Sequence, residues 1–367
     1  MGLMAPTLRT LTLVCIALCM SLYGTTAECL STEKFLEMKR HLRSLNKPAV
    51  KSIQILEPSS CVSSNETRHI LELPDGGCPE GTVPIRRVQM QDLLRAPSLS
   101  TFGKKLYAAN SSFGSLAQSS NNIQYRWAKI DSKNGDLYGT HAHINLWTPY
   151  VKGKDKYSSA QVWLFSGLMI NSTSFKPDGL YVSEELFGNA EPRFYIYWTV
   201  DRYISTGCYN TLCPGFVSVH PRIPLGRTFR QMSSPGGDQF FVRVKIVKER
   251  LDWWLYVNEE KIGFWPQRIF NHINEKAERA SWGGEVFSVQ GVEFPPMGSG
   301  AVAAEGFAQA AFVKSMQLVN GDGQYYEAPT DTKRVVDTRC YSLASDGVNE
   351  DPNWRRYFYF GGPGGRC

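Results

Sequence analysis

The chain has 367 residues, of which 42% are hydrophobic and 12% aromatic, and its formal net charge is +6. This length allows two domains of ordinary size. Because the positive excess is small and its charges are interspersed, we expect no nucleic-acid partner and at most weak attraction to acidic polysaccharide.

Residues 1–27 have the pattern of a secretory signal peptide. Arg9 is the only charge before the apolar run 11–22, and Thr25-Thr26-Ala27 offers a small-residue cleavage site. The apolar run is too short to span a membrane, and no later segment is long and apolar enough. The mature product is therefore expected to be soluble, without a membrane anchor, and extracellular.

The cysteine count predicts disulfides in an oxidising compartment. Two of the nine cysteines lie in the signal segment, which leaves an odd number and so one free or intermolecular thiol. No Cys/His cluster has zinc-finger spacing, so no metal is expected. The candidate pairs are Cys61–Cys78, Cys208–Cys213 and Cys340–Cys367, with Cys29 left over.

Three Asn-x-Ser/Thr sequons agree with secretion. They begin at Asn65, Asn110 and Asn171. Each predicts a surface loop if it is glycosylated.

The region before residue 96 is predicted to be a small α+β unit. Residues 31–46 have apolar side chains at helical spacing after a capping Ser31 or Thr32, and Asn46 and Pro48 end the pattern. Short extended pieces follow. Residues 96–122 are rich in Ser, Asn and Gly, which is typical of an exposed, flexible linker and a site of proteolytic processing.

From about residue 123 the pattern is β throughout. Phe194, Ile196, Trp198 and Val200 alternate with polar or aromatic neighbours, and residues 240–246 show the same period of two. Further strands are expected at 137–147, 160–167, 215–219, 252–257, 285–290 and 307–319, with one short helix near 266–279. Many short strands between Gly/Pro turns predict an antiparallel β-sandwich of the jelly-roll kind.

Several segments together resemble the plant neprosin family of secreted glutamic peptidases, and the resemblance covers essentially the whole mature chain. They are Cys78-Pro-Glu-Gly-Thr-Val-Pro-Ile-Arg-Arg, Tyr138-Gly139-Thr140 through Trp147, Gly207-Cys208-Tyr209-Asn210-Thr211-Leu212-Cys213-Pro214-Gly215-Phe216-Val217, Gly263-Phe264-Trp265-Pro266, Trp282-Gly283-Gly284-Glu285, Met297-Gly298-Ser299-Gly300 and the C-terminal Tyr357-Phe-Tyr-Phe-Gly-Gly-Pro-Gly-Gly-Arg-Cys367.

The resemblance implies a zymogen. An activation-type domain at 28–95 would cover a catalytic-type sandwich at 123–367 and be removed by cutting the linker 96–122, typically in acid. The mature enzyme would be a glutamic endopeptidase that cuts proline-containing peptides or proteins. For an extracellular plant protein of this kind, the resemblance implies a location in the apoplast or cell wall. No cofactor is implied, and we expect a monomer.

A glutamic peptidase uses two carboxyl groups on facing strands, one to take a proton from water and one to protonate the leaving amine. Glu285 matches one of the two family glutamates. Two glycines before it allow a close approach of the backbone, and Trp282 is the best candidate to line the cleft. Anchoring the other motif on Gly179 places Pro177, which has no acid, at the second catalytic position.

Neighbouring residues offer weak substitutes for the missing acid. Asp178 would point to the opposite face of an extended strand unless a bulge beside Pro177 turned it inward. Glu184 and Glu185 are interpreted as solvated. His141 and His143 share a strand face, but no third metal ligand accompanies them, so a strand-surface role is preferred.

Two hypotheses follow. The first is a secreted glutamic peptidase zymogen with reduced or lost activity. The second is a catalytically silent secreted β-sandwich that binds peptide or cell-wall polymer. In the second, Glu285 is a buried structural acid.

Overall fold

The computed structural model describes residues 31–51, 70–73, 77–105, 123–166, 173–201, 206–270 and 273–367. The predicted signal segment, Cys29, Cys61 and the three sequon asparagines lie outside these ranges. The chain divides into two units, Met1–Lys47 and Pro48–Cys367. Among the described residues, no helix has the length and apolar character needed to cross a membrane.

The first unit contains the predicted helix, α2 (Thr32–Leu45). Ser31 caps its N-terminus, because the Ser31 side chain accepts a hydrogen bond from the Lys34 backbone N–H at 3.2 Å. Asn46 ends it. The sequence prediction of this helix is confirmed.

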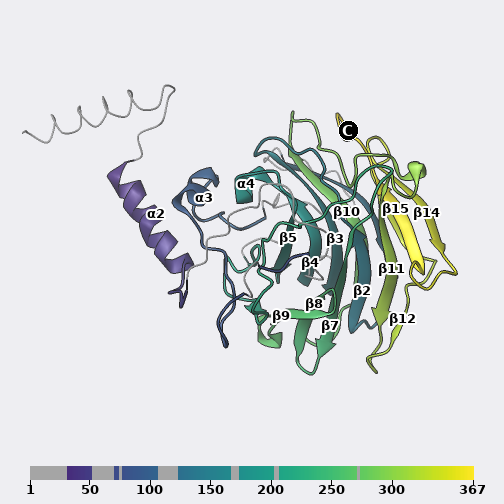
Figure 1. Cartoon of the computed structure of the whole chain (residues 1–367), viewed down its shortest axis with the longest axis horizontal. Coiled ribbons are helices and arrows are strands. Elements are labelled where there is room, and N and C mark those ends of the chain that lie inside the picture. The colour runs from purple at the N-terminus through teal and green to yellow at the C-terminus, as the bar shows by residue number, and fades with distance from the viewer. Residues whose placement is uncertain are drawn as a thin grey trace, which may run out of the picture. The chain divides into compact units, whose positions relative to one another are not determined.

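The second unit is built from two antiparallel sheets, which confirms the predicted β-sandwich (Figure 1). The six-stranded sheet has the order β13 (Lys333–Val336), β1 (Ile123–Asp131), β10 (Arg279–Val289), β3 (Lys156–Ser166), β4 (Thr173–Val182), β5 (Arg193–Thr199). The nine-stranded sheet has the order β14 (Ser342–Val348), β15 (Arg356–Gly361), β11 (Ala311–Val319), β2 (Gly139–Asn145), β7 (Phe241–Glu249), β8 (Asp252–Val257), β9 (Glu260–Trp265), β6 (Val217–Ser218), with β12 (Tyr325–Glu327) paired to β11.

The main core lies between these sheets, where inward-facing residues of both pack together. Trp282 belongs to this core. Its side chain is fully buried, and its indole Nε1 donates to Thr140 Oγ1 of β2 at 3.1 Å. The expectation that Trp282 lines a cleft is therefore corrected: residues three apart on a strand face opposite sides, so Trp282 points away from the face that carries Glu285.

The helical elements of this unit are short: α3 (Met90–Arg95), α4 (Glu184–Phe187) and the 3₁₀ turns η2 (Gln267–Ile269) and η3 (Ala303–Glu305). Of the helix expected near 266–279, the described residues contain only the 3₁₀ turn η2. The Ala277 backbone pairs with Leu137 as an isolated β-bridge, so it takes an extended rather than a helical partner.

Two of the three expected disulfides are present, Cys208–Cys213 and Cys340–Cys367. Cys78 has a free thiol in the structure. Because Cys61 lies outside the described residues, its pairing with Cys78 stays a prediction.

Candidate active site

Glu285 lies near the middle of β10, on the outer face of the six-stranded sheet. The register places it between Trp127 of β1 and Ser159 of β3. The first of the two glycines that precede Glu285 is required by the packing of the strands. Gly283 has φ +140°, and a Cβ there would lie 2.3 Å from the Ala128 carbonyl oxygen, so only glycine lets β1 and β10 approach this closely.

The Glu285 carboxylate is almost completely buried, with 2% of the residue exposed. Its Oε1 accepts from the Tyr157 hydroxyl at 2.5 Å and from Gln161 Nε2 at 3.5 Å. Its Oε2 accepts from the Trp127 indole at 3.0 Å. Burial of a carboxylate costs free energy unless hydrogen-bond donors compensate for the lost water. The strands of the sandwich themselves supply several of these donors to Glu285.

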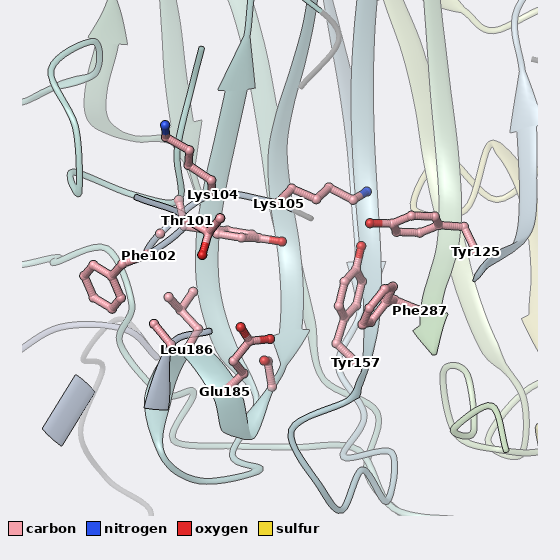
Figure 2. A pocket seen from close by; sticks show the side chains of 13 residues that line it. Thr101, Phe102, Lys104, Lys105, Tyr125, Tyr157, Glu185, Leu186 and Phe287 are labelled. Atoms are coloured by element: carbon pink, nitrogen blue, oxygen red, sulfur yellow. The ribbon is translucent and has the colours of Figure 1, made fainter. Parts of the chain in front are cut away.

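A further donor comes from the N-terminal part of the second unit. Lys105 Nζ lies 2.6 Å from Glu285 Oε1, and only 4% and 3% of the two side chains are exposed. The ammonium also lies 4.5 Å from the ring centroid of Tyr125 and 5.8 Å from that of Tyr157. Figure 2 shows Lys105 extending toward both tyrosines, whereas Lys104 points away. The site is thus occupied by a lysine of its own chain.

The segment that carries Lys105 is held against the sheet by its backbone. The Gly103 carbonyl accepts from the Tyr209 backbone N–H at 2.8 Å, and the Lys105 N–H donates to the Tyr197 hydroxyl at 3.3 Å. The Phe102 side chain is buried. The expectation of an exposed linker is therefore corrected for residues 101–105, which pack into the site; residues 106–122 lie outside the description.

The same segment forms one wall of a pocket (Figure 2). Its other walls come from β1, β3, β10, the α4 region and the loop at Tyr209. The lining residues are Ala96, Thr101, Phe102, Gly103, Lys104, Lys105, Tyr125, Tyr157, Ser183, Glu185, Leu186, Tyr209 and Phe287. Five of these thirteen residues are aromatic, and the others include two lysines and a glutamate, so the lining combines apolar rings with a few charged groups.

Glu185 lines this pocket, which corrects its interpretation as a solvated turn residue. It lies on the short helix α4 and is half-buried. Burial, reinforced by repulsion from Asp155, raises the pKa of its carboxyl to about 7. A carboxyl of this kind holds its proton at mildly acidic pH and can donate it.

Two family models match the chain: Neprosin over residues 154–363 and the neprosin activation peptide over residues 28–137. The chain belongs to the neprosin family. The family domain contains Glu285, and the activation-peptide match contains Lys105, so the buried ion pair joins the two parts that the family models distinguish.

Solved structures share the two-sheet architecture only distantly. A scytalido-glutamic peptidase bound to a peptide-based transition-state analogue has 6% identity and a TM-score of 0.34, and the match covers 65% of this chain and 98% of that one. CG-16, a homodimeric agglutinin from chicken liver, has 14% identity and a TM-score of 0.22, with 47% and 98% covered. Likenesses at these TM-scores carry no argument about the site.

The second catalytic position of the family falls on β4, where the backbone contains a bulge. Gln161 of β3 pairs with Asp178, and its neighbour Ala160 pairs with Leu180, so Gly179 is the extra residue. Pro177 pairs with the core residue Ile196 of β5. The register therefore places Asp178, rather than Pro177, opposite a residue that contacts Glu285. The identity of the second acid stays a prediction.

The other sequence candidates do not join this site. His141 and His143 lie on β2 in the other sheet, with rings 5.0 Å apart, and burial lowers the pKa of both imidazoles. Within the described ranges, no group of three or more His, Cys, Asp or Glu side chains is placed to hold a metal ion.

Sequence reasoning missed the donors around Glu285. Tyr157, Ser159 and Gln161 alternate along β3, and this period of two was a readable signal that they share a face. Lys105 had no such signal, because it reaches the site from 180 residues away.

Proposed function

We propose that the chain is the zymogen of a secreted, neprosin-type glutamic endopeptidase, with Glu285 as its ionised catalytic carboxylate and its own residues 96–105 as the latency device. The observation that supports this proposal best is the buried contact between Lys105 and Glu285. A lysine paired with the catalytic carboxylate occupies the place where a water and a scissile peptide would have to lie, so the unprocessed chain is inactive.

In the processed enzyme, Glu285 takes a proton from water as the water oxygen attacks the scissile carbonyl carbon. The proton passes to the carboxylate, and a second, protonated acid donates to the leaving amine as the C–N bond breaks. General acid–base assistance of this kind is worth roughly 10²–10⁴-fold in rate. The hydrogen bonds from Tyr157 and Trp127 keep the Glu285 carboxylate in one orientation.

Because Pro177 replaces the family glutamate, another acid has to protonate the leaving group. Among the described side chains, Glu185 is the best candidate, since it lines the pocket and its raised pKa of about 7 keeps it protonated in mild acid. Asp178, which lies on β4 and pairs with Gln161 of the neighbouring strand β3, is the alternative. Neither lies at the family position, so we expect slow hydrolysis. Cleavage beside proline is proposed from family membership alone.

We expect acid to favour activation, because transient protonation of Glu285 removes the charge that holds Lys105. The released segment can then be cut in the linker 96–122.

The test is to acidify the purified full chain and follow two products by mass spectrometry: cleavage within 96–122 and hydrolysis of a proline-containing peptide. We expect both, with the hydrolysis rate lowered at least about 10²-fold in Glu285→Gln. Glu293→Gln, at a site where the side chain is 61% exposed, is the matched control and should retain activity. Hydrolysis that survives Glu285→Gln would refute the assigned mechanism.

The second candidate function is a silent β-sandwich that binds a peptide or cell-wall polymer in the extracellular space. The aromatic lining of the pocket and the substitution at Pro177 favour it. Absence of hydrolysis by a processed, folded protein that still binds ligand in the pocket would select this function.

A further inference from the structure

Lys105 acts as a built-in ligand, so its surroundings report what the site recognises. The ammonium is enclosed by one carboxylate oxygen at 2.6 Å and by the faces of Tyr125 and Tyr157 at 4.5 and 5.8 Å. A carboxylate under aromatic rings attracts a cation through both charge and the ring quadrupoles. These groups belong to the sandwich and remain when the segment leaves.

We propose that the site vacated by Lys105 is a lysine-binding subsite, which takes the side chain of a lysine on a peptide ligand. The proposal deepens the proposed function, since it rests on removal of residues 96–105 from the cleft. A peptide that places a lysine there reproduces the zymogen contact, and it competes with productive binding at Glu285.

The geometry distinguishes lysine from arginine. A guanidinium gains most from a carboxylate when it bonds both oxygens side by side. Here a guanidinium lying along both oxygens would have to share Oε2 with the Trp127 indole, which donates to it at 3.0 Å. A compact ammonium needs only Oε1, which is the oxygen that Lys105 contacts. The subsite is therefore selective for a primary amine.

A neutral side chain of the same length would fill the space that Lys105 occupies, but it would not compensate the negative charge of Glu285. With such an occupant, Glu285 would lose its cation while staying buried, which costs free energy. Lysine recognition thus depends on Glu285, whereas an apolar contact with the aromatic walls would not.

Cavity rescue tests this in the unprocessed chain, without any requirement for activity. Lys105→Ala removes the atoms that correspond to n-propylamine. Propylammonium chloride should raise the unfolding midpoint of this variant by about 2 °C at ten times its dissociation constant. Equal concentrations of n-propanol and ethylguanidinium should give much smaller shifts. The response should disappear in Lys105→Ala/Glu285→Gln.

A response to propanol as large as that to propylammonium, or one that survives Glu285→Gln, would overturn the proposal. A larger response to ethylguanidinium would overturn the lysine selectivity.

If Lys105→Ala does not fold, Lys105→Arg provides the second test, because it keeps the charge. We expect chymotrypsin to cut at Phe102 at least about 5-fold faster in Lys105→Arg than in the wild type. Equal protection in the two proteins would contradict the proposed subsite. Neither measurement uses the peptidase activity of this chain, so failure here leaves the peptidase proposal standing. Failure of the peptidase test likewise leaves the proposed subsite standing.

Discussion

Two buried lysine–carboxylate pairs lie on the same face of the six-stranded sheet, and they differ in what they connect. Lys129 pairs with Asp131 two residues along β1, with 4% and 6% of the side chains exposed. Lys105 pairs with Glu285 across 180 positions. The burial and the chemistry are alike, but the first pair lies within one strand, whereas the second joins the sheet to the segment at residues 96–105, which we propose is removed by processing. In our proposal, the same kind of interaction therefore stabilises the fold in one place and keeps the enzyme latent in the other.

The largest effect is expected at the structural pair. In Lys129→Met, Asp131 remains buried with the Ser281 hydroxyl at 2.6 Å but without its cation. Breaking a buried pair from one side costs about 3–5 kcal/mol of the free energy of unfolding. Urea unfolding measures this loss. The exposed pair Lys133–Asp331 is the control, and Lys133→Met should unfold like the wild type. Equal behaviour of the two variants would contradict a structural role for Lys129.

A smaller loss of stability is expected for Lys105→Met, about 1–3 kcal/mol, because Glu285 keeps its bonds from Tyr157 and Trp127. The effect on local opening of the segment is expected to be greater than the effect on the free energy of unfolding of the whole domain. Without the ion pair, residues 96–105 leave the cleft more often, so chymotrypsin should cut at Phe102 at least about 10-fold faster.

Lys104→Met is the matched control for this cleavage, because the Lys104 side chain points away from the site in Figure 2. If both variants were cut at the same rate, the ion pair would not hold the segment. A double-mutant cycle with Glu285→Gln gives the coupling energy directly.

The smallest effect is a pH dependence at Glu185. Its folded-state pKa of about 7 lies above the ordinary value of 4.5, so the folded state binds this proton more tightly. That contribution to stability is complete below pH 4.5 and is lost as the pH rises through 7. Glu185→Gln is always neutral, and we expect it to be more stable than the wild type at pH 8 and equal to it at pH 4. Thermal unfolding at the two pH values measures the difference. A constant difference between the proteins would show that Glu185 is not buried as described.

The sequence predicted the sandwich because alternation along strands such as β5 and β7 is a local signal. It also predicted that glycines precede Glu285 for a close backbone approach, which Gly283 makes to β1. It did not predict the face on which Trp282 lies, since this strand is buried on both sides and has no exposed polar face to set the alternation. Lys105 was beyond sequence reasoning altogether, because nothing local in a Ser/Asn/Gly-rich segment shows which lysine is buried.

The hydrogen bonds to Glu285 from both neighbouring strands have one more consequence. Trp127 on β1 and Tyr157 on β3 belong to the rigid sheet, so departure of Lys105 changes the charge at the site without reorienting the carboxylate. The site is preorganised. An incoming ligand or water therefore meets an acceptor that is already ordered. Exchange of the internal lysine for an external partner then depends on their relative affinities and effective concentrations, without a further cost for ordering the carboxylate.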